Sequence, residues 1–162
     1  MNISAIVAMA NQNVIGKNNQ LPWRLPEDLK HFRALTLNHT VVMGKNTFLS
    51  IAKALPERRN LVLTRDKSFK AEDIEVFHDI ESLLAELKLI PDTIFVIGGA
   101  TIYQQLLPFC TTLYITQIDA DIDGDTFFPE INLKEWQEKQ RISITKNAST
   151  AFDYHFLTLQ RI

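Results

Sequence analysis

Short apolar runs that alternate with helical segments restrict the folds open to this chain more than any other feature. Residues 3–9 (ISAIVAM) are almost continuously apolar, which is typical of a strand buried on both faces of a sheet. The same pattern predicts further strands at residues 40–43, 60–64, 74–77 and 94–97. Helices are expected between them, at about residues 26–37, 46–53, 80–89 and 98–107. This alternation favours an α/β fold with a mostly parallel central sheet flanked by helices.

The C-terminal third of the chain has a different pattern. Longer strands are expected at residues 112–119, 138–146 and 152–160. A turn-rich connector at 146–150 joins the last two, so they predict an antiparallel C-terminal hairpin and a mixed sheet. A chain of 162 residues is long enough to bury a full core, and we expect one domain over residues 1–162.

Composition excludes several classes of function. The net charge of −2, without long runs of one sign, argues against nucleic acid or an anionic membrane as the partner. Cys110 is the only cysteine, which excludes an intrachain disulfide and a cysteine zinc site, and the four histidines lack metal-ligand spacing. The N-terminal apolar run is too short to span a bilayer. We therefore expect a cytoplasmic monomer without a metal.

The segment from Leu21 to Phe32 contains the most informative candidate residue. Pro26 suits the first position of a helix, and Asp28 then shares a helix face with Phe32, beside an apolar stripe that includes Leu29 and Leu35. A carboxylate beside a buried stripe is costly unless a partner pairs with it, and a cationic or amide-like ligand edge would be such a partner. The simpler alternative is that the acids of this first turn only complement the helix dipole.

Two strand-to-helix junctions carry glycines that would allow close approach of a phosphate. They are Gly44-Lys45-Asn46-Thr47 and Gly98-Gly99-Ala100-Thr101. Free N–H groups at helix N-termini bind phosphate oxygens, and two such junctions in one sheet suit a pyrophosphate. Taken singly, each junction is more typical of an ordinary strand-to-helix turn than of a phosphate site. Neither G-x-G-x-x-G nor a Walker-type phosphate loop is present.

Basic residues near strand ends indicate further negatively charged groups on the ligands. Lys45 and Arg65, with the hydroxyl of Thr64, would favour the extra phosphate of NADP over NAD. Arg58 would clamp a ligand carboxylate. For all three basic residues the alternative is a solvated surface cation. Tyr103 lies four residues after the second glycine and would face that junction or merely pack.

Taken together, seven ordered segments resemble dihydrofolate reductase of the short bacterial type over essentially the whole chain. They are Val14-Ile15-Gly16, Leu21-Pro22-Trp23, Leu25-Pro26-x-Asp28-Leu29-x-x-Phe32, Val42-Met43-Gly44-Lys45-x-Thr47, Leu55-Pro56-x-Arg58-x-Asn60, Ile97-Gly98-Gly99-Ala100-x-Ile102-Tyr103 and Gly124-Asp125-Thr126-x-Phe128-Pro129. The resemblance implies reduction of 7,8-dihydrofolate to tetrahydrofolate with NADPH as cofactor, and binding of antifolate inhibitors.

The resemblance also implies roles for individual residues around the substrate. Asp28 matches the acidic residue of the pterin pocket and is expected to have a raised pKa. Trp23 would hold a water near the pterin, Thr116 would support Asp28, and Arg58 would bind the glutamate carboxylate. The walls of the pterin and aminobenzoyl pocket would be Ile6, Val7, Leu29, Phe32, Ile51 and Ile97.

Cofactor residues are implied in the same way. Ala8, Ile15 and Tyr103 would flank the nicotinamide, and a cis peptide would join Gly98 to Gly99. The remaining cofactor positions would be Gly16, Leu21, Gly44, Lys45, Asn46, Thr47, Leu63, Thr64, Arg65, Gly98, Gly99, Ala100, Thr101, Ile102 and Asp125. Residues 10–24 would form a mobile lid, with Asp125 in the loop that meets it.

Three positions depart from the family pattern, and two other functions compete with it. Leu21 replaces a methionine of some members, His31 an aromatic residue and Ala100 a third glycine. One alternative is a reductase of another heterocycle, such as a pyrimidine intermediate of riboflavin synthesis, which Asp28 and Arg58 argue against. The other is a non-catalytic nucleotide-binding or regulatory domain. Turnover of dihydrofolate would separate the three.

Overall fold

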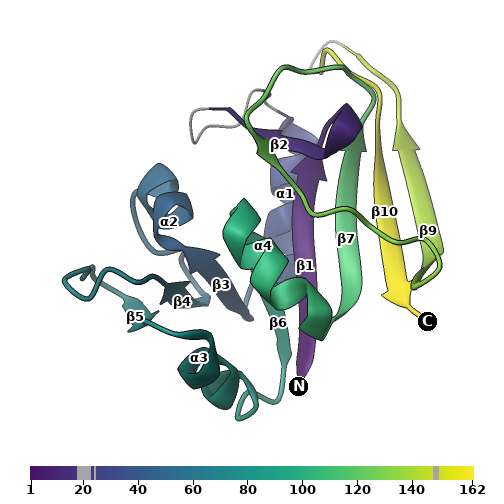
Figure 1. The fold of residues 1–162 in the computed structure, drawn as a ribbon. Helices are drawn as coiled ribbons and strands as arrows, with labels where there is room; N and C mark the ends of the chain where they lie inside the picture. Colours follow the sequence, from purple (N-terminus) through teal and green to yellow (C-terminus); the bar gives the residue numbers. More distant parts are fainter. Residues whose placement is uncertain (18–22, 24, 148–149) are drawn as a thin grey trace.

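A single twisted sheet of eight strands organises the computed structural model, which describes residues 1–17, 23, 25–147 and 150–162. The strand order is β5-β4-β3-β6-β1-β7-β10-β9, and β10 runs in the direction opposite to the other seven strands (Figure 1). The strands are β1 (Asn2–Met9), β3 (Thr40–Gly44), β4 (Arg59–Leu63), β5 (Ile74–Phe77), β6 (Thr93–Gly98), β7 (Cys110–Ile118), β9 (Trp136–Ile144) and β10 (Tyr154–Arg161). The predicted mixed, mostly parallel α/β sheet with a C-terminal antiparallel hairpin is confirmed.

Four helices cover the two faces of this sheet. They are α1 (Pro26–Thr36), α2 (Lys45–Ile51), α3 (Ile80–Leu87) and α4 (Ala100–Leu106), with short 3-10 turns at Asn11–Asn13 and Leu107–Phe109. In Figure 1, α4 lies in front of the strands and α1 behind them. Side chains of α3 and α4 join one buried cluster, and those of α1 and α2 pack on another, so each sheet face has its own core.

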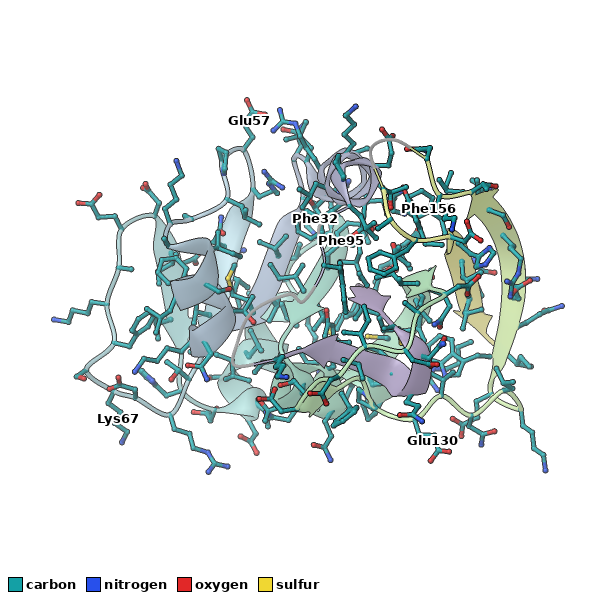
Figure 2. The ribbon with its side chains drawn as sticks, turned by 90° about the horizontal axis from the view of Figure 1, so that it is seen from above. Phe32, Glu57, Lys67, Phe95, Glu130 and Phe156 are labelled. Atoms are coloured by element: carbon teal, nitrogen blue, oxygen red, sulfur yellow. The ribbon has the colours of Figure 1, made fainter. Side chains whose placement is uncertain are left out.

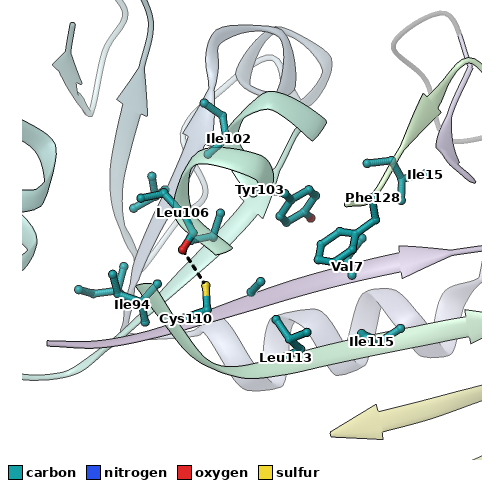
Figure 3. Packing of buried hydrophobic residues seen from close by; sticks show 14 of the residues in the cluster. Val7, Ile15, Ile94, Ile102, Tyr103, Leu106, Cys110, Leu113, Ile115 and Phe128 are labelled. Carbon is teal, nitrogen blue, oxygen red and sulfur yellow. Dashed lines mark hydrogen bonds between the residues drawn. The ribbon is translucent and has the colours of Figure 1, made fainter. Parts of the chain in front are cut away.

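Strand alternation decides which core each residue enters. Ile3, Ala5 and Val7 of β1 lie in the α4-side cluster, where Figure 3 shows Val7 near Tyr103 and Phe128. The intervening residues point to the α1 side, where Figure 2 shows Phe32, Phe95 and Phe156 gathered beside the helix. Because adjacent side chains point to opposite faces of a strand, the two cores are built from interleaved sequence positions.

The long N-terminal loop contains structure that its sequence did not reveal. A three-residue strand β2 (Val14–Gly16) pairs with the two-residue strand β8 (Thr126–Phe127), and the Asp125 N–H donates to the Gly16 carbonyl at 3.0 Å. Ladders this short are too brief for a periodic pattern to predict. A Cβ on Gly124 would lie 2.3 Å from the Val14 side chain and 2.7 Å from the Gly16 carbonyl oxygen, so only glycine permits this approach.

Other predicted boundaries differ by one or two residues. The helix predicted to end at residue 89 ends at Leu87, and the strand predicted from residue 138 begins at the buried Trp136. Hydrophobic periodicity predicts that a helix or strand exists better than it predicts the residue at which it ends. Within the described ranges, no helix has the length and apolarity needed to cross a membrane.

Candidate active site

Asp28 lies in the first turn of α1, on the side of the helix that meets strand β7 of the sheet. Pro26 begins the helix as predicted, and Thr116 of β7 donates a hydrogen bond to Asp28 Oδ1 at 2.6 Å. Burial raises the pKa of Asp28, while the Thr116 hydrogen bond and the nearby His31 oppose this rise. The raised pKa confirms the expectation from sequence. An acid that only complemented the helix dipole would face solvent, so the alternative reading of this turn does not fit.

The apolar residues around Asp28 divide between the two faces of the sheet. Ile6 belongs to the α1-side core, and Phe32, Ile51 and Ile97 pack against that core. Val7, predicted for the same pocket wall, points to the opposite core because it follows Ile6 directly along the strand. The resemblance therefore assigned to one wall two residues whose side chains lie on opposite faces of the sheet.

Leu29 also differs from its predicted position. Its side chain is 55% exposed, although we expected it on or beside the buried stripe of α1. A spacing of three residues turns backwards by roughly 60° at each step around a helix. The row Leu29, Phe32, Leu35 therefore turns by roughly 120°, and Leu29 leaves the buried face while Asp28 remains on it.

Tyr103 lies beneath the second glycine junction and has a fixed hydroxyl. Its side chain is 4% exposed, its O–H donates to the Ile6 carbonyl at 2.7 Å, and burial raises its pKa. A Cβ on Gly98 would lie 3.4 Å from this hydroxyl, so Tyr103 does face the junction. Its ring centroid is 4.8 Å from that of Phe128, a neighbour visible in Figure 3.

The two glycine junctions adjoin at the carboxyl edge of the sheet. Met43 pairs with Gly98 between β3 and β6, and the Thr47 hydroxyl lies 3.6 Å from the Cβ position of Gly98 and of Gly99. The peptide between Gly98 and Gly99 is cis, as the family resemblance implied. Neither Gly44 nor Gly99, the cap residues of α2 and α4, has a side-chain cap hydrogen bond. Backbone N–H groups of both first turns are thus free of side-chain caps and suit phosphate oxygens.

The other predicted cofactor positions share this edge of the sheet. Leu63, Thr64 and Arg65 end and follow β4; Arg65 is exposed, as are Asn46 and Thr101. Ala100 and Ile102 begin α4, and Ile102 is buried against Gly44. Figure 1 shows the ends of β3 and β4 beside each other, below α2.

Lys45 has an acidic partner that the sequence did not indicate. Its Nζ lies 2.8 Å from Asp66 Oδ2 and 5.6 Å from the ring centre of Phe69. Lys45 and the Ser68 hydroxyl and N–H hold the pKa of Asp66 well below its usual range. Lys45 and Asp66 are 21 positions apart, so no local sequence pattern indicated this pairing.

Arg58 is half-buried and fixed by two hydrogen bonds. Its Nε donates to the Pro56 carbonyl at 2.9 Å and its Nη1 to the buried Thr36 hydroxyl at 3.0 Å. Burial, followed by the nearby Arg33, lowers the pKa of Arg58. Thr36 was not predicted as a site residue, because a threonine at the end of a helix carries no sequence pattern that distinguishes it.

The lid positions are only partly described. Ile15 and Gly16 are buried in β2, and the Asp125 carboxylate accepts from the Thr126 hydroxyl at 2.9 Å. Trp23 is 9% exposed and joins a cluster with Leu25. Leu21, a predicted cofactor residue, lies outside the described residues. No three metal-ligating side chains come together within the described ranges.

Comparison with known proteins places these features in one family. A family model described as dihydrofolate reductase matches residues 2–161. The chain is 40% identical to the dihydrofolate reductase of Staphylococcus haemolyticus over 164 residues, covering 100% of this chain and 97% of that protein. It is 43% identical over 161 residues to the type 3 dihydrofolate reductase of Salmonella typhimurium, covering 99% of each.

A solved structure agrees with these sequence comparisons. The dihydrofolate reductase from Enterococcus faecalis, complexed with NADP(H) and RAB-propyl, superposes with a TM-score of 0.93 and 35% identity. The match covers 99% of this chain and 96% of that one. The full-length family match, the relatives and the shared fold agree, and the chain belongs to the dihydrofolate reductase family.

Proposed function

We propose that the protein catalyses the NADPH-dependent reduction of 7,8-dihydrofolate to 5,6,7,8-tetrahydrofolate and so supplies one-carbon metabolism. This is the reaction of its family. The observation that carries it is the position of Asp28. A partly buried carboxyl with a raised pKa, held by Thr116, lies on an apolar face that continues to the two glycine junctions. A flat heterocycle with N–H donors fits the acid, and a dinucleotide fits the junctions.

The groups of this chain bind and orient the substrate around one acid. Thr116 fixes the orientation of Asp28, whose other oxygen would accept from the pterin amino group and ring N–H. Asp28 would thereby favour a protonated pterin, which is the form that accepts hydride. Trp23 would hold a water at the same end of the pocket. The walls would be formed by Ile6, Leu29, Phe32, Ile51 and Ile97, with the Val7 backbone beside them.

The two glycine junctions provide the features that a dinucleotide cofactor needs. Uncapped helix N-termini after Gly44 and Gly99 suit the pyrophosphate, and Lys45, Thr64 and Arg65 suit the additional phosphate. When bound, NADPH supplies the hydride. Tyr103, held neutral by burial, would flank the nicotinamide with Ala8 and Ile15. Gly16, Leu21, Asn46, Thr47, Leu63, Gly98, Ala100, Thr101, Ile102 and Asp125 would complete the site.

The direct test is the loss of NADPH absorbance with dihydrofolate. Turnover that depends on both substrates supports the proposal. Turnover only with a pyrimidine intermediate of riboflavin synthesis would indicate the reductase of another heterocycle. A folded protein that binds NADPH and turns over neither compound would indicate a binding domain.

Arg58 is expected to recognise the glutamate tail. Changing Arg58 to glutamine should raise KM for dihydrofolate by about 10- to 100-fold with little change in kcat, because a charge-assisted hydrogen bond to a carboxylate is lost. Steady-state kinetics check this. Dihydropterin, which lacks the tail, is the matched control substrate and should be reduced equally well by both proteins. Equal loss with both substrates would contradict the assignment.

Asp66 is expected to weaken the hold of Lys45 on cofactor phosphate. Changing Asp66 to asparagine frees Lys45 Nζ, so KM for NADPH should fall by about two- to fivefold while KM for NADH stays constant; the size reflects the weak energies of half-exposed ion pairs. The exposed Glu72, changed to glutamine, is the control for the loss of one negative surface charge. A higher KM for NADPH in the Asp66 variant would mean that Asp66 positions Lys45.

The assembly and location that we propose are a single-domain monomer over residues 1–162, in the cytoplasm, that antifolates inhibit at the pterin pocket. The edge strand β9 is largely exposed and carries Glu138, Lys139 and Arg141, and charges of this kind discourage edge-to-edge pairing. Sedimentation should give one species near 18.6 kDa. A dimer at micromolar concentration would contradict this proposal without affecting the reaction.

A further inference from the structure

Tyr154 of β10 has a buried hydroxyl that no hydrogen bond explains. The residue is 0% exposed, and its Oη is one of two buried side-chain polar atoms without a partner in the part of the chain that the structure describes. Buried tyrosine hydroxyls usually find a partner, since an unpaired polar group in an apolar interior is costly. An unpaired phenol retained in a core therefore indicates a partner that binds there.

The register of the sheet places Tyr154 next to the partner of Asp28. Phe156 pairs with Thr116 across β10 and β7, and Tyr154 pairs with Ile118 one step further along. Side chains two residues apart share a sheet face. Tyr154 is therefore the diagonal neighbour of Thr116, on the face that meets α1, and Thr116 is the residue that bonds Asp28.

The Tyr154 ring packs against residues that precede α1 and against an aromatic pair beside α1. Tyr154 shares a buried cluster with Trp23 and Leu25, the residues just before α1. It also contacts Phe156 edge to face, with ring centroids 5.5 Å apart, and Phe156 stacks on His31 at 4.1 Å. The phenol thus lies between the segment that holds Trp23 and the first two turns of α1.

The charges that face the hydroxyl are negative. Burial raises the pKa of Tyr154, and the carboxylates of Glu27 and Asp28 raise it further. The phenol is therefore a neutral donor at physiological pH, on the sheet face where Thr116 bonds Asp28. Its chemistry complements an anion, or a water that in turn donates to one.

We propose that Tyr154 is a further positioning residue of this reductase: its hydroxyl donates to a water bound between it and Trp23, its neighbour in the same cluster, and this water supports the Asp28 carboxylate. This rests on the reaction proposed above. A donor to the carboxylate favours the ionised acid, and the ionised acid stabilises the protonated pterin that accepts hydride. Tyr154 touches neither substrate nor cofactor and acts only through Asp28.

The groups that set the pH dependence come from each element around the phenol. From α1 they are Glu27, with Lys30 as its partner at 3.6 Å, Asp28, and His31, whose pKa is lowered first by burial. Described residues of β7, β9 and the Trp23 segment that pack on Tyr154 contribute uncharged side chains, including Ile118 and Ile144. A change at Tyr154 is therefore expected to act mainly on the Asp28 carboxyl.

The test is the pH profile of hydride transfer in single turnovers of the Tyr154→Phe protein with NADPH and dihydrofolate. The apparent pKa of this profile, which reports protonation of the bound pterin, should fall by roughly 0.5 unit, because a less ionised Asp28 stabilises the protonated pterin less. Rates should then match wild type at low pH and be about threefold lower at high pH, with KM for NADPH unchanged. Tyr114→Phe is the matched control: it removes a hydroxyl from the same sheet face, two residues from Thr116, and should leave the profile unchanged.

Two further measurements distinguish positioning from packing. If Tyr154 only packs in an apolar cluster, Tyr154→Phe should change thermal stability and leave the pH profile identical to that of the wild type. This result would overturn the proposal. In the Asp28→Asn background, Tyr154→Phe should have no further effect on rate. If Tyr154→Phe fails to fold, 3-fluorotyrosine at 154, a stronger donor of nearly equal shape, should raise the apparent pKa; an unchanged value would overturn the proposal. Wild-type turnover tests the reaction separately.

Discussion

Changing Asp28 to asparagine is expected to lower kcat at pH 7 by about 10²- to 10³-fold, the usual contribution of one positioned acid. Asparagine still accepts the Thr116 hydrogen bond but cannot carry the negative charge that stabilises a protonated pterin. Activity should recover partly as the pH falls, because the substrate then takes its proton from solvent. Pre-steady-state rates of NADPH oxidation from pH 5 to 9 check both effects.

The same substitution should not destabilise the fold. Burial holds the pKa of Asp28 above its value in the unfolded chain, so the stability of the protonated form is lost as pH rises through the folded pKa. At pH 7 asparagine removes that cost, and Tm should be equal or higher. Glu27→Gln, which neutralises the exposed neighbour of Asp28, should retain near wild-type turnover. A large loss in the Glu27 variant, or none in the Asp28 variant, would contradict the role given to Asp28.

Changing Gly98 to alanine is expected to damage both stability and cofactor binding. Gly98 has a φ of +120°, a conformation essentially restricted to glycine, so alanine should cost about 1–3 kcal/mol. Tm should fall by roughly 3–9 °C for a chain of this size. Because Gly98 borders the Thr47 hydroxyl and Tyr103, any backbone shift alters the phosphate junction, and KM for NADPH should rise at least about tenfold.

Gly44 provides the comparison for the stability effect. Its φ is −87°, and a Cβ there would lie 3.0 Å from a flexible carbon of Ile102, which can move by a few tenths of an ångström. Gly44→Ala should therefore lower Tm clearly less than Gly98→Ala. Thermal unfolding followed by circular dichroism measures both. Equal losses would show that crowding, and not backbone conformation, controls these junctions.

Local patterns were sufficient for the architecture. Pro26 at the helix start, the continuous apolar run at 3–9 and the glycines after β3 and β6 each depend on neighbouring residues only, and the structure confirms the elements they predicted. The order of the motifs along the chain was enough to identify the family. Roles around the cofactor remain predictions, because they concern atoms of a second molecule.

The residues that the patterns misplaced or missed depend on distant contacts. The resemblance implies that Val7 and Leu29 line the pocket wall, but only the structure shows that the Val7 side chain enters the opposite core and that the Leu29 side chain is largely exposed. The pairing of Lys45 with Asp66 joins residues 21 positions apart. The strands β2 and β8 exist only because they pair with each other across more than a hundred residues.

The sequence by itself therefore determined the alternation of strands and helices, the helix that presents Asp28 and the class of ligand, since these follow from periodicity and residue chemistry. Only the tertiary structure decided that the Asp28 carboxyl is buried, so that its pKa rises, and which side chains besides Thr116 lie around it. Thr116, which the family resemblance already implied, contacts Asp28 from 88 residues away, and the register of β7 and β10 places Tyr154 diagonally beside Thr116. Desolvation and hydrogen bonding depend on atoms in space, and the order of residues along the chain does not specify them.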